Sequence, residues 1–147
     1  MTKQLDDLFT FLRFPSISTD SNHAGDVRAC ADWIVQKLDG MGLSVELHET
    51  PKHPIVVARN DHKEGKKTLL IYGHYDVQPV DPLELWDTPP FEPEIRDGRI
   101  WGRGATDNKG QMLAHILGVE ESLEKNGELP VNLILLFEGE EEIGSPN

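Results

Sequence analysis

The chain has 147 residues, of which 37% are hydrophobic and 27% charged, as in an ordinary globular domain with a buried core. A formal net charge of −12 disfavours nucleic acids and anionic membranes as partners, because both are negatively charged themselves. The longest apolar stretch, 133–137, is too short to span a membrane, and the N-terminal residues do not resemble a signal peptide. Cys30 is the single cysteine and cannot form an internal disulfide, so we expect a cytoplasmic protein.

The first half of the chain is predicted to form two helices and two strands. Apolar residues recur at helical spacing up to Phe14, and Pro15 ends this first helix. A longer apolar stripe over 27–38, followed by glycines, predicts a second helix. Alternating residues over 43–47 predict a half-buried strand, and the apolar run 55–58 predicts another.

The second half is predicted to form a strand, a helix and a second strand. The nearly continuous apolar run 68–72 is typical of a strand buried on both faces. After a proline-rich connection, in which 94–101 predicts a small hairpin, a helix begins near Asn108 and ends before Gly127. Residues 131–137 predict a second buried strand. Strands joined by a crossover helix are parallel, so we expect an α/β fold with a mostly parallel, helix-flanked sheet.

Ligands of such sheets bind where the strands end and the crossover helix begins. His74 and Asp76 follow the first of these strands and lean to the same side of an extended chain. A metal-bound histidine commonly has its second ring nitrogen held by a carboxylate, a role that Asp76 suits. Taken alone, these two residues favour a simpler alternative, a satisfied histidine beside an exposed aspartate.

Asp107 stands just before the predicted crossover helix, in a segment rich in glycine. It has two possible roles, as the cap of the helix or as a carboxylate that bridges two metal ions, with glycines permitting close backbone approach. A P-loop is excluded because Asn108, not glycine, precedes Lys109. A dinucleotide-binding fingerprint is excluded because Asp107 occupies the position of its third glycine.

Four glutamates follow the last strand, at positions 138, 140, 141 and 142. Their mutual repulsion requires a cation or raised pKa values to offset it. A turn can aim two adjacent glutamates inward, so that one holds a metal and its neighbour acts as general base on a metal-bound water. The alternative is an ordinary acidic loop.

The remaining histidines are poorer candidates. The HExxxH spacing that begins at His48 is one residue too long for the helical zinc-peptidase motif, and Pro51 prevents the helix. His115 is expected on the crossover helix, away from the ligand-binding end. The others are expected to be exposed in polar loops, namely His23, His53 and His62.

Four segments, GHYDVQP, WDTPPFEP, GRGATDNKG and EGEEEIGS, occur in the same order as in a known enzyme family. Over roughly 70–145 the chain resembles the dizinc metallopeptidases that include carnosinases, bacterial dipeptidases, aminoacylases, acetylornithine deacetylase and succinyl-diaminopimelate desuccinylase. The GHYDVQP form is similar to the carnosinase and dipeptidase branch.

The resemblance implies a role for each candidate residue. His74 would bind one metal ion, Asp107 would bridge two, and Glu142 would bind the second. Glu141 would be the general base and Asp76 would support His74, with a cis peptide bond after Asp107. Two divalent ions are implied, zinc first, with cobalt or manganese as alternatives. The reaction would be hydrolysis of a dipeptide or, alternatively, of an N-acyl amino acid; a non-catalytic metal-binding domain is the remaining possibility.

The resemblance also implies that residues 1–147 are the N-terminal part of a catalytic domain, truncated before a lid domain that often mediates homodimerisation. Two further metal ligands would lie in later sequence. We therefore expect weak metal affinity and negligible turnover from this chain alone, and a sheet that is partly uncovered.

Overall fold

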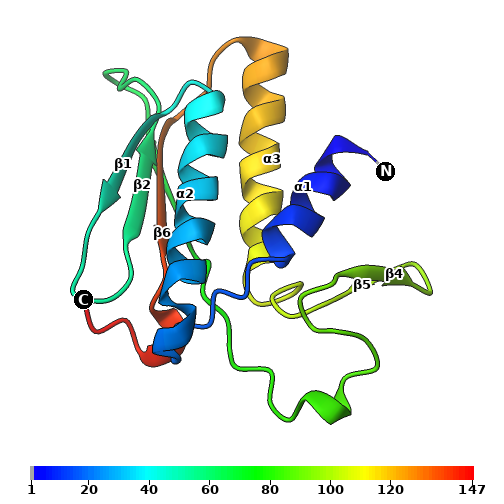
Figure 1. Ribbon diagram of the computed structural model, residues 1–147. Coiled ribbons are helices and arrows are strands. Elements are labelled where there is room, and N and C mark those ends of the chain that lie inside the picture. The colour runs from blue at the N-terminus through cyan, green and yellow to red at the C-terminus, as the bar shows by residue number, and fades with distance from the viewer. Residues whose placement is uncertain (1) are drawn as a thin grey trace.

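The computed structural model describes residues 2–147 (Figure 1). Three helices are present, α1 (Lys3–Leu12), α2 (Ala24–Gly40) and α3 (Lys109–Asn126). The six strands are β1 (Ser44–His48), β2 (Ile55–Arg59), β3 (Thr68–His74), β4 (Glu94–Arg96), β5 (Arg99–Trp101) and β6 (Asn132–Glu138). Short 3₁₀ turns occupy Ser21–His23, Leu83–Leu85 and Glu141–Ile143. Every predicted helix and strand is therefore present. None of the helices in the described part combines the length and hydropathy that a membrane crossing requires.

The main sheet has the strand order β1-β2-β6-β3. β3 and β6 run parallel, from Thr68 opposite Asn132 to His74 opposite Glu138, as the crossover helix predicted. β1 pairs with β2, and β2 with β6, in antiparallel fashion. The α/β class is thus confirmed. The expected parallel pair is present, but the sheet of the described residues is mixed and not mostly parallel; β1 and β2 are joined by residues 49–54 without a crossover helix and so pair antiparallel.

Helices α2 and α3 pack on one face of the sheet, with α1 beside α3 (Figure 1). Apolar side chains of both long helices and of the inner strands form a single core between them. Its fully buried members include Val27, Ile34, Leu38, Val56, Met112, Ile116, Leu135 and Phe137. The apolar stripes that predicted α2 and α3 are the faces that pack here.

The expectation that 68–72 is buried on both faces is wrong. Leu70 and Tyr72 are 58% and 50% exposed. β3 lies at the edge of the sheet and pairs with β6 alone, so its backbone is open on one side. The helices cover a single face, and since strand residues alternate, 70 and 72 point to the uncovered one.

A buried lysine joins the end of α1 to the start of α3. Lys109 is 0% exposed, and its Nζ donates to the carbonyls of Phe14 at 2.7 Å and Phe11 at 3.2 Å. Burial lowers the pKa of this amine. The contact fixes the N-terminal segment against the part of α3 that adjoins the candidate site.

Candidate metal centre

Three of the predicted residues meet at the rim where β3 and β6 end and α3 begins. His74 is the last residue of β3, Asp107 lies just before α3, and Glu142 lies in the 3₁₀ turn after β6. Each offers one ligand atom, and these atoms all lie within 4.8 Å of one another. Parallel pairing of β3 with β6 produces this convergence, since it brings both carboxyl ends to the same edge.

The two nitrogens of His74 have different surroundings. Nε2 faces the carboxylates, 3.0 Å from Asp107 Oδ1 and 3.8 Å from Glu141 Oε2. Nδ1 is turned inward, 3.3 Å from Asp76 Oδ1 and 3.2 Å from the Asp76 carbonyl. A histidine that binds a metal commonly has its second ring nitrogen held by an acceptor in this way, so the geometry of His74 is compatible with that role.

Asp76 is fully buried and contacts more than His74. It accepts hydrogen bonds from the Ser18 hydroxyl at 2.6 Å and from the N–H groups of Glu141 at 3.2 Å and Glu142 at 3.0 Å. Burial by itself raises the pKa of this carboxyl, but the bonds from His74, Ser18 and the Glu142 N–H outweigh it and hold the pKa below its usual value. The alternative in which Asp76 is exposed is therefore wrong as to its exposure.

The four glutamates after β6 divide into two pairs. Glu138 accepts from the Tyr72 hydroxyl at 2.6 Å and from Ser145 Oγ at 2.9 Å. Glu140 is 3% exposed and accepts from the His53 N–H at 2.8 Å and from Thr50 Oγ1 at 2.9 Å. The carboxylates of this first pair, Glu138 and Glu140, thus accept hydrogen bonds from groups of the protein.

Glu141 and Glu142, the second pair, lie at the rim. Gln78 Nε2 donates to Glu142 Oε2 at 2.6 Å, and the Glu141 side chain is 45% exposed. These two glutamates of the turn, and Asp107 before α3, are the acidic side chains at the rim that a bound cation would neutralise.

The backbone around Asp107 packs tightly against the first residues of α3. The peptide bond between Asp107 and Asn108 is cis, as the family resemblance implied. Asn108, not Asp107, is the N-cap of α3, which leaves the Asp107 carboxylate 72% exposed and beside His74. A Cβ on Gly110 would lie 2.1 Å from the Ala105 carbonyl oxygen, so only glycine permits this approach.

His53 was predicted to be exposed and is instead 5% exposed, with Nε2 3.1 Å from the Ser18 carbonyl. His53 thus lies between Ser18 and Glu140, next to the candidate site. The sequence around His53 is a polar loop without apolar periodicity, and so it did not indicate that this side chain is buried. His23 is half-buried against Asp26 at 2.7 Å, and His62 and His115 are exposed.

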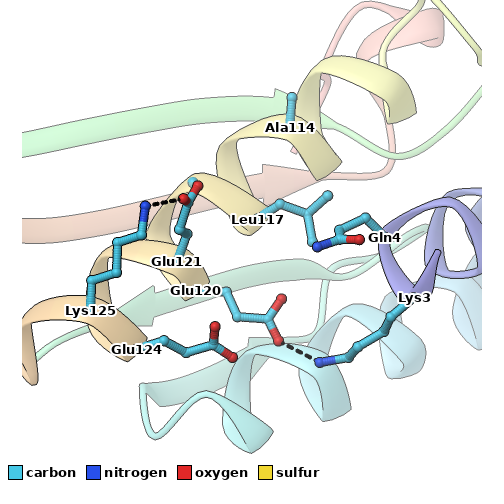
Figure 2. Close-up of a pocket in the computed structure, with 9 residues that line it drawn as sticks. Lys3, Gln4, Ala114, Leu117, Glu120, Glu121, Glu124 and Lys125 are labelled. Carbon is cyan, nitrogen blue, oxygen red and sulfur yellow. Dashed lines mark hydrogen bonds and ion pairs between the residues drawn. The ribbon is translucent and has the colours of Figure 1, made fainter.

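A separate hollow lies between α1 and the middle and end of α3 (Figure 2). Lys3 bonds Glu120 at 2.9 Å across it, and Lys125 pairs with Glu121 on α3. These are mostly exposed ion pairs, remote from the N-terminal end of α3 where the candidate centre lies.

Comparisons with known proteins identify the family of this chain and several relatives. The model of peptidase family M20/M25/M40 matches residues 70–147. The Cys-Gly metallodipeptidase dug1 of Schizosaccharomyces pombe is 37% identical over 142 residues, which cover 89% of this chain and 30% of that protein. The human Beta-Ala-His dipeptidase is 43% identical over 95 residues, which cover 65% of this chain and 19% of that protein.

Among solved structures, the M20 family metallo-carboxypeptidase Sso-CP2 from Sulfolobus solfataricus superposes with a TM-score of 0.91. It is 42% identical, and the match covers all of this chain and 33% of that one. The chain spans about a third of the length of the curated relatives it matches first.

Proposed function

We propose, since the chain belongs to peptidase family M20/M25/M40, that it provides metal-binding residues of a metal-dependent dipeptidase. The reaction is hydrolysis of the amide bond of a dipeptide or small peptide. One observation carries the proposal: the ligand atoms of His74, Asp107 and Glu142 lie within 4.8 Å of one another although the residues are far apart in the chain. The dipeptidases among the relatives favour this substrate class over N-acyl amino acids, whose hydrolysis would use the same donors.

The donor set fits divalent zinc. One imidazole nitrogen and several carboxylate oxygens are ligands that zinc accepts, and cobalt or manganese can use them too. With Asp107 as bridge, one ion would be held by His74 and Asp107 and a second by Asp107 and Glu142. A catalytic zinc keeps three protein ligands, so the complete centre needs ligands in addition to these. We infer that they belong to a longer polypeptide, of cytoplasmic location and with the capacity to form a homodimer.

Each side chain then has a distinct task. A bound metal pair supplies acidification of a water and polarisation of the scissile carbonyl. Glu141 accepts the proton of the attacking water at a carboxylate oxygen and returns it to the leaving amine. Its 45% exposure leaves this side chain open to solvent and to a substrate. Asp76 holds His74 Nδ1 so that Nε2 is directed at the ion.

Metal titration of the purified chain tests the centre. Zinc binding to the wild type, measured by competition with a chromophoric chelator, is expected to be weakened strongly by His74→Ala, because it removes the single nitrogen donor of the three. His115→Ala is the matched control, since His115 is exposed on α3. Equal affinities for wild type and His74→Ala would contradict the proposed centre.

A further inference from the structure

The segment between α1 and α2 passes directly beside the candidate metal centre. Ile17 forms a parallel bridge with Val77, and the Val77 N–H donates to the Ser16 carbonyl at 2.9 Å. Ser18 follows, 7% exposed and therefore enclosed by the fold. Burial of a serine hydroxyl costs free energy unless the hydroxyl forms a hydrogen bond within the protein.

The hydroxyl and the carbonyl of Ser18 are connected by two different routes to the glutamates that follow β6. Its hydroxyl donates to Asp76 Oδ2 at 2.6 Å, and Asp76 in turn accepts from the N–H groups of residues 141 and 142. Its carbonyl faces His53 Nε2 at 3.1 Å, and the His53 N–H donates to Glu140 Oε1 at 2.8 Å. Ser18 is thus connected to Glu141 and Glu142 through Asp76, and to Glu140 through His53.

The hydroxyl completes the hydrogen bonding of Asp76. A carboxylate offers about four acceptor positions on two oxygens. Oδ1 lies 3.3 Å from His74 Nδ1 and 3.2 Å from the Glu141 N–H, and Oδ2 lies 3.0 Å from the Glu142 N–H and 2.6 Å from Ser18 Oγ. The contact with Ser18 is the shortest of these four. Without it, the Glu142 N–H is the remaining donor to Oδ2 within residues 2–147.

We propose that Ser18 is a positioning residue of the metal centre. It fixes the Asp76 carboxylate in the one orientation that serves His74 and the 141–142 turn together, and so sets the distance between donors from β3 and from the segment after β6. Ser18 is not one of the three residues that would hold the ion, and it would act through Asp76. The inference rests on the proposed function, in which His74 and Glu142 hold the ion.

The test compares two serines of the same segment in the full 147-residue chain. Ser18→Ala removes the bond to Asp76. Ser16→Ala is the control: Ser16 is 0% exposed and its hydroxyl also makes a 2.6 Å bond, but to the Tyr75 carbonyl. By chelator competition, Ser18→Ala is expected to weaken zinc binding roughly ten- to a hundredfold, as losses of such supporting bonds do. Ser16→Ala should leave zinc binding near that of the wild type, and equal weakening by both would overturn the proposal.

A second measurement needs no metal. Amide hydrogen exchange of Glu141 and Glu142 in the metal-free chain measures local opening of the turn. The amide of Leu135 in β6 serves as the reference for global unfolding. Ser18→Ala should accelerate exchange of both amides several-fold relative to Leu135, whereas Ser16→Ala should not. Unchanged amides in Ser18→Ala would overturn the inference. If the wild type binds no zinc, the proposed function fails by itself, and the amide rates still test whether Ser18 positions the 141–142 turn.

Discussion

The environment of His74 makes metal binding depend on pH. Burial alone would lower its pKa, but the hydrogen bond to Asp76 and the charges of Asp76, Glu141 and Asp107 outweigh that effect and raise the pKa to about 9. In the metal-free protein the imidazole is therefore protonated at neutral pH. A metal binds the neutral ring and must displace this proton.

We accordingly expect zinc affinity to increase by about tenfold per pH unit between pH 7 and pH 9, and to level off above the pKa. Calorimetry at pH 7.5 in two buffers of different ionisation enthalpy measures the protons released on binding. The expected release from His74 is close to one. Binding without proton release at this pH would show that Nε2 is not a ligand.

Glu141 differs from its neighbour Glu142 in what its loss should do. Glu141→Gln keeps the shape of the side chain but removes the base. Hydrolysis of a dipeptide by the longer polypeptide proposed above should therefore fall roughly 10²–10⁴-fold. Zinc affinity should change little, whereas Glu142→Gln should weaken it. Turnover and chelator competition on the two variants separate the roles. Normal turnover by Glu141→Gln would remove it from the reaction.

At the scale of elements, the approach of α3 to the segment before it depends on Gly110. Its missing Cβ would lie 2.1 Å from the Ala105 carbonyl oxygen, so Gly110→Ala must displace backbone. We expect a loss of about 1–3 kcal/mol in the free energy of unfolding, as for other overpacked sites. Gly118, on the same helix with nothing within 4 Å of its Cβ position, is the control.

Gly118→Ala should instead stabilise α3 by about 0.5–1 kcal/mol, because alanine loses less conformational entropy in a helix. Urea unfolding of both variants gives the two free energies. Shifts of the same sign would mean that the contact with Ala105 does not limit residue 110.

The elements also show why part of the site was predictable. Apolar periodicity marked α2, α3 and β6, and the crossover rule then placed residues 74, 107 and 142 on one rim. The contacts of Asp76 with Ser18 and with the 141–142 turn join residues 58 to 66 positions apart, which periodicity does not report. His53 was mispredicted for the same reason, since its burial comes from Ser18 and Glu140.

At the scale of the molecule, one face of the sheet is uncovered (Figure 1), and the edge strand β3 has a partner strand on one side only within the described residues. A continuous apolar run predicted that 68–72 would be enclosed, but enclosure depends on layers beyond the strand, and Leu70 is 58% exposed at an open edge. Such edges promote strand-to-strand association. Leu70→Lys should therefore raise the concentration at which the chain begins to scatter light.

Leu85→Lys makes the same charge change at a residue that is 78% exposed outside the sheet, and should have a smaller effect. Light scattering over a concentration series compares the two. If both variants gain equally, net charge and not the open edge governs association.

The donors of the centre come from β3, from the start of α3 and from the turn after β6, so no short stretch of the unfolded chain contains them together. An ion held by all three would act like a reversible cross-link that closes two long loops and favours the folded ensemble by mass action. The cell's supply of the free ion would then influence how long this polypeptide survives before proteolysis.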